Sequence, residues 1–141
     1  MRTRKRRAAA PALWQWVVVA VALALLGDDQ HFAPLIDRAV SLARSRGEFG
    51  ILAEALSVRA VRHQVQHRFD PAAREAEESV QFARELGAAN VEARSVSILA
   101  HVAAVRGDDE AAVRHAEQVL EVAAAHGLGP RASYAFYALA M

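Results

Sequence analysis

The segment Gly107-Asp108-Asp109 decides the fold, because the same three residues also stand at Gly27-Asp28-Asp29. Further glycines stand at positions 47, 87 and 127, which are evenly spaced along the chain. A glycine at the end of an apolar periodic stretch stops a helix, because it takes the left-handed conformation at little cost. Stop signals at a fixed interval are typical of chains built from stacked, near-identical units. The sequence therefore predicts a repeat of about 40 residues.

Composition makes all-α the expected fold class. The chain of 141 residues is 54% hydrophobic, has no cysteine and four prolines, and is rich in alanine, the strongest helix former. We predict an α-solenoid, a right-handed stack of antiparallel helix hairpins with about 3.5 units. Residues 1–10 are expected to form a basic, disordered tail. The helical repeat domain is expected to cover 11–141, with units at about 11–47, 48–87 and 88–127 and a final helix at 130–141.

Each unit is predicted to contain a first and a second helix. Ala20, Ala60 and Ala100 share one register in the first helices, where small residues let the two helices of a hairpin approach closely. Asp70 is expected to cap the middle second helix, with Pro71 at its first position. The first helices are expected at about 49–67, 89–106 and 131–141, and the second helices at about 32–46, 71–86 and 109–126.

The amino-terminal segment allows two interpretations. A basic run at Arg2–Arg7, two tryptophans and an apolar stretch together resemble a signal anchor at residues 12–26. The stretch nevertheless ends at the Gly27 turn, in register with the later units, and this favours a first solenoid helix with protein on both sides. The first interpretation places the chain at the inner membrane, and the second places it in the cytoplasm.

A basic stripe is the candidate partner site. Arg59, Arg62, His63 and Gln66 follow the spacing i, i+3, i+4, i+7, so they share one face of a helix. In a solenoid of this type the first helices line the concave groove, where the stripe could receive an acidic peptide or a phosphate. Arg94 and His101 on the next first helix are expected to extend this groove. The simpler interpretation is a solvated helix face.

His63 and His67 stand at positions i and i+4, which suits metal binding. The zinc-protease version of this spacing carries a glutamate where this chain has Gln64, and an amide cannot act as a general base. No third ligand follows from spacing. We therefore expect neither a metal nor another cofactor.

Enzymatic activity is not expected. The sequence holds no Gly-x-x-x-x-Gly-Lys loop and no Ser/His/Asp set in a strand–turn–helix context. The net charge is +1, so the composition gives no argument for direct binding to nucleic acid.

The last predicted helix carries three aromatic residues and no charge after Arg131. End repeats of solenoids usually present a polar cap. Tyr134, Phe136 and Tyr137 are therefore candidates for a docking end that receives further repeats or a second copy of the chain.

These patterns resemble the tetratricopeptide repeat. Ala100 and Gly107-Asp108-Asp109-Glu110-Ala111-Ala112 match its small–Gly–acidic–Ala spacing, whereas His67 stands where the middle unit should have Gly, and Ala76 and Ala116 replace the usual aromatic residues. The longer, Ala- and Arg-rich repeat is similar to the tetratricopeptide-like segment of large LuxR-type ATPase transcriptional regulators of actinobacteria. The resemblance covers about residues 20–141. It implies a non-enzymatic module that binds a protein or peptide partner; the alternative is a membrane-anchored scaffold of the same fold.

Overall fold

A computed structural model describes residues 13–127. This part of the chain contains six α-helices and no strand, so the predicted all-α class is confirmed. The predictions for the tail at 1–10, for the final helix at 130–141 and for its aromatic residues fall outside the described residues. The helices are α1 (Leu13–Leu25), α2 (Asp29–Ser45), α3 (Phe49–Val65), α4 (Phe69–Leu86), α5 (Ala89–Val105) and α6 (Asp109–His126).

A left-handed residue separates each helix from the next at a regular interval. From α2 onward the helices begin at positions 29, 49, 69, 89 and 109, which are evenly spaced. The residues at 27, 47, 67, 87, 107 and 127 all have positive φ. After each of the first five, the next residue donates its backbone N–H to the carbonyl five positions earlier, over 2.8–3.0 Å. Each predicted repeat unit thus holds two helices and two identical turns.

His67 occupies the one turn among these where the sequence has no glycine. Its φ is +58°, a conformation that costs a residue with a Cβ about 1–2 kcal/mol. The turn still closes, because Arg68 donates to the His63 carbonyl over 2.8 Å. The side chain of His67 also packs edge-on against the Phe69 ring, with 5.7 Å between ring centroids.

The predicted start of α4 is wrong, because the helix begins at Phe69 and not at Pro71. The cap is Arg68, whose side chain makes no capping hydrogen bond, and the carboxylate of Asp70 instead pairs with Arg106, the residue that follows α5. Pro71 is the third helical residue, where a missing N–H still breaks no intrahelical bond. The turn at His67 therefore sets the start of the helix, and Asp70 does not.

Aspartates do cap the helices at two other turns. Asp28 accepts a hydrogen bond from His31 N at the start of α2, and Asp108 accepts one from Ala111 N at the start of α6. These are the two aspartates that directly follow a turn glycine, in the repeated Gly-Asp-Asp segments. The position of the residue relative to the turn therefore decides whether an aspartate can cap.

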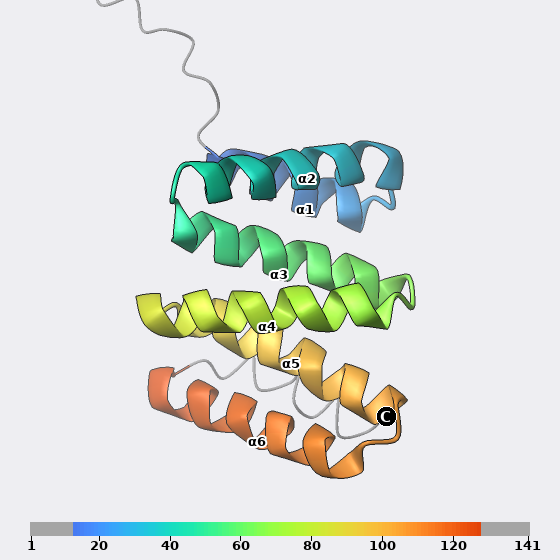
Figure 1. Cartoon of the computed structure of the whole chain (residues 1–141), viewed down its shortest axis with the longest axis vertical. Coiled ribbons are helices and arrows are strands. Elements are labelled where there is room, and N and C mark those ends of the chain that lie inside the picture. The colour runs from blue at the N-terminus through green and yellow to red at the C-terminus, as the bar shows by residue number, and fades with distance from the viewer. Residues whose placement is uncertain (1–12, 128–141) are drawn as a thin grey trace, which may run out of the picture.

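The helices pack in the order of the chain. Figure 1 shows α1 and α2 at one end of the longest axis and α6 at the other. Each described helix packs on its neighbours in the chain, and the odd-numbered helices α1, α3 and α5 also pack on each other in sequence. An ion pair between Arg44 and Glu78 (2.8 Å) joins α2 to α4.

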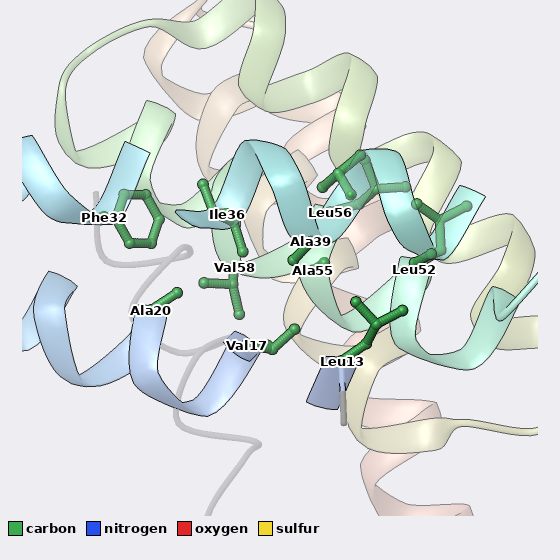
Figure 2. Packing of buried hydrophobic residues seen from close by; sticks show 12 residues of the cluster. Leu13, Val17, Ala20, Phe32, Ile36, Ala39, Leu52, Ala55, Leu56 and Val58 are labelled. Carbon is green, nitrogen blue, oxygen red and sulfur yellow. The ribbon is translucent and has the colours of Figure 1, made fainter. Parts of the chain in front are cut away.

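The first core cluster lies where α1, α2 and α3 meet. Val17 and Ala20 of α1 face Phe32 and Ile36 of α2, and Val58 of α3 closes the cluster (Figure 2). Ala20, Ala60 and Ala100 are completely buried, as expected for positions of close helix approach. The core thus continues from one helix pair to the next.

Buried serines join α3, α4 and α5. The Ser95 hydroxyl donates to the Ser79 hydroxyl over 3.0 Å, and Ser79 donates to the backbone carbonyl of Ala53 over 2.7 Å. Both serines are completely buried, so each hydroxyl hydrogen bond replaces one that water can no longer supply.

The expectation that α1 has protein on both sides is wrong for the described chain. Its inner side lies in the core, but Trp14, Val18, Val19 and Leu25 are exposed. Within residues 13–127, no helix is both long enough and apolar enough to cross a membrane.

The left-handed turns give a test of the repeat geometry. We expect His67→Gly to stabilise the protein by about 0.5–1 kcal/mol, because glycine relieves the positive φ at some cost in chain entropy. Gly107→Ala should destabilise it by about 1 kcal/mol, because its Cβ would meet open space and only the backbone conformation opposes it. Urea unfolding, with circular dichroism as the signal, measures both changes in the free energy of unfolding. Destabilisation by His67→Gly would mean that the imidazole contacts outweigh the backbone cost.

Candidate partner-binding groove

The arginines of the predicted basic stripe lie against carboxylates of neighbouring helices. Arg59 donates to Asp37 on α2 over 2.9 Å and to Glu75 on α4 over 2.8 Å, with its side chain 21% exposed. Arg62 pairs with Asp29 at the start of α2. Both guanidinium groups therefore join helices within the chain, which leaves little free positive charge for a partner.

His63 belongs to the same network. Its Nε2 lies 3.6 Å from Oε2 of Glu75, and burial lowers its pKa despite that carboxylate. His67 is at the following turn and Gln66 is exposed beside it. In the described part of the chain, no three His, Cys, Asp or Glu side chains come together as a metal-binding group.

The remaining predicted groove residues, Arg94 and His101, make separate contacts from α5 to neighbouring helices. Arg94 donates to Glu54 over 2.6 Å and to the Ser57 hydroxyl over 2.7 Å. His101 contacts Gln64 and meets the Phe69 ring edge-on, with 6.2 Å between ring centroids. Apart from the exposed Gln66 and the turn residue His67, the predicted side chains therefore contact residues of neighbouring helices.

A groove that the sequence did not predict lies between α1 and α3. It has a volume of about 360 Å³. Trp14 and Val21 form one wall, Ile51 forms the other, and Gly50 leaves that wall without a side chain. Among the described lining residues, Glu54 is the only ionisable one, and it is already paired with Arg94. Within residues 13–127, the lining consists of Trp14, Val17, Val18, Val21, Gly50, Ile51 and Glu54.

The chemistry of this groove favours an apolar ligand. Burying an unpaired charge in it would cost free energy, because the lining offers no counterion beyond the Glu54–Arg94 pair. Trp14 is 56% exposed and gives a large surface on which an aliphatic or aromatic side chain can pack. The sequence does hold a signal for this surface, because Trp14, Val18 and Val21 follow the spacing i, i+4, i+7. The same spacing is also typical of a helix covered by protein, so it does not by itself indicate a groove.

We expect Glu75→Gln to destabilise the protein by about 1–3 kcal/mol, because it leaves the mostly buried Arg59 with weaker partners. Glu78→Gln is the matched control on the same helix. It removes the more exposed pair with Arg44 and should cost about 0–1 kcal/mol. Equal losses in urea unfolding would contradict the structural role of the Arg59 network.

Burial, followed by the charge of His67, lowers the pKa of His101. The folded state therefore disfavours the protonated ring. The contribution of neutral His101 to the stability of the fold is complete above the unfolded pKa of about 6.5 and declines as the pH falls below that value. We expect His101→Gln to reduce the loss of stability between roughly pH 7 and pH 5. Urea unfolding across this range measures the slope, and comparison at pH 8 isolates the change in packing. An unchanged slope would show that His101 does not contribute.

No family model matches the chain, and no curated protein matches it significantly.

Proposed function

We propose that the chain is a tetratricopeptide-like α-solenoid and acts as a non-enzymatic module for binding a protein or peptide. The even spacing of the helices along the chain supports the repeat, and the packing in chain order supports the stack. In such arrays the odd-numbered helices line one continuous surface suited to extended partners.

The apolar groove between α1 and α3 carries the proposal. It combines an exposed tryptophan with aliphatic walls, which is the composition of a surface that binds an apolar side chain or a short helix. The single carboxylate of its described lining is paired, so these residues present no acid and base positioned to act together on a bound molecule. The groove therefore fits recognition better than catalysis.

We further propose that the chain serves as the repeat segment of a LuxR-type transcriptional regulator in the bacterial cytoplasm. This rests on the motif at Ala100 and Gly107-Asp108-Asp109. In that family the segment lies between an ATPase module and a helix-turn-helix domain, so partner binding to the repeats would be transmitted to DNA-bound transcription. Contact with DNA would not involve this segment.

The alternative is a scaffold of the same fold held by a signal anchor at residues 12–26. The exposed apolar side chains of α1 favour it. Against it, Leu13, Val17 and Ala20 are buried in the first core cluster, so insertion of α1 into a membrane would remove them from α2 and α3. We therefore favour the interaction module.

Selection from a random peptide library tests the proposed function. Peptides that bind the immobilised chain should be apolar, and Val21→Lys should weaken their binding at least about tenfold, since it places a charge in the groove. Val113→Lys on α6 is the control, because Val113 is also an exposed valine but lies outside the groove. Titration by fluorescence anisotropy measures both. Equal affinity for the two variants would exclude the groove as the binding site.

A further inference from the structure

Equivalent positions on α1, α3 and α5 differ sharply in exposure. Val18, Val58 and Ile98 occupy the same register position on these successive odd-numbered helices. Val58 is 8% exposed and Ile98 is 2% exposed, because each faces the helix pair before it. Val18 occupies the same position on α1 and is 56% exposed.

Two neighbouring register positions show the same difference in exposure between α1 and the later odd-numbered helices. At the first, Arg59 and Leu99 are partly buried, whereas Val19 is exposed. At the second, Arg62 pairs with Asp29 of the preceding pair and Val102 is buried, whereas Ala22 is exposed. The side of α1 formed by Val18, Val19 and Ala22, here called the outer face, therefore corresponds to the surface that joins one helix pair to the pair before it.

We propose that the outer face of α1 binds the outer face of α1 in a second copy of this chain. A two-fold axis between the copies places the two helices antiparallel and makes the contact self-complementary. This interface is separate from the peptide groove in function, although Val18 lies at the border of both.

The absence of charge on α1 favours α1 of a second copy as its partner. Leu13–Leu25 contains no Asp, Glu, Lys or Arg, whereas every other described helix contains both acidic and basic residues. Where α3 meets α2, Arg59 and Arg62 find Asp37 and Asp29 opposite them. The described residues of the outer face offer no such counterion, so a charged helix placed on them would lose hydration without gaining a pair. Among the described helices, only α1 has no charged residue, so only α1 of a second copy could pack on the outer face without this loss of hydration.

The size of the face sets the expected strength of the dimer. A helix of 13 residues is about 20 Å long, so two such helices form an interface below the size of most stable complexes. Association should therefore depend on concentration.

Sedimentation velocity of the full chain over a range of concentrations tests the proposal. We expect a monomer–dimer equilibrium in the wild type and at least a tenfold larger dissociation constant for Val19→Asp, which introduces a charge at the centre of the face. Val113→Asp, at an exposed valine of α6, is the matched control and should associate as the wild type does. Circular dichroism should show the same helix content in all three proteins.

Three outcomes would overturn the proposal. The first is a wild-type chain that stays monomeric up to about 1 mM. The second is a dimer that Val19→Asp does not weaken, since the contact would then lie elsewhere. The third is a monomeric chain that floats with uncharged phosphatidylcholine vesicles, which would assign the outer face to a lipid surface. Peptide binding through the groove could persist in each case, so failure here is distinct from failure of the proposed function.

Discussion

The structure depends on one backbone constraint, the left-handed residue that closes each helix at a regular interval along the chain. The bond from the following residue to the carbonyl five positions earlier satisfies a group that the helix end leaves unpaired. Helices of nearly equal length follow from α2 onward. Because the helices have nearly equal lengths, equivalent residues lie at the same height along successive odd-numbered helices. Ala20, Ala60 and Ala100 can therefore all be sites of close helix approach.

Much of this arrangement could be predicted from glycines alone. Gly47, Gly87 and Gly127 mark where helices end, because the physical reason for glycine there is local. The turn between α3 and α4 was also expected after residue 67, but His67 gives no glycine signal there, and the start of α4 was placed two residues late. The start of α4 was misplaced for a related reason: Asp70 has the chemistry of a cap, but the position of the turn decides which residue is the cap. Long-range partners follow from neither spacing nor residue type, so a stripe of arginines could be located on a helix without its carboxylates being foreseen.

The odd-numbered helices carry two kinds of surface. Their polar side chains join them to other helices, and the apolar surface of the groove is the one that we propose binds a partner. The charged residues that stood out in the sequence are largely occupied by other helices, as Arg94 is by Glu54 and Ser57. The surface that we propose for a partner is the apolar groove between Trp14 and Ile51. A charged residue in a sequence of stacked helices is thus weak evidence for a binding site, because the joints between units need ion pairs of their own.

The hydroxyl chain from Ser95 through Ser79 to Ala53 has a mechanical consequence. Alanine-lined helix surfaces are smooth, and shape alone resists sliding along their axes only weakly. A bond of 2.7–3.0 Å breaks when one helix shifts by a fraction of a turn, and the broken bond would leave a buried hydroxyl unsatisfied. The serines therefore fix the position of α3, α4 and α5 along one another's axes.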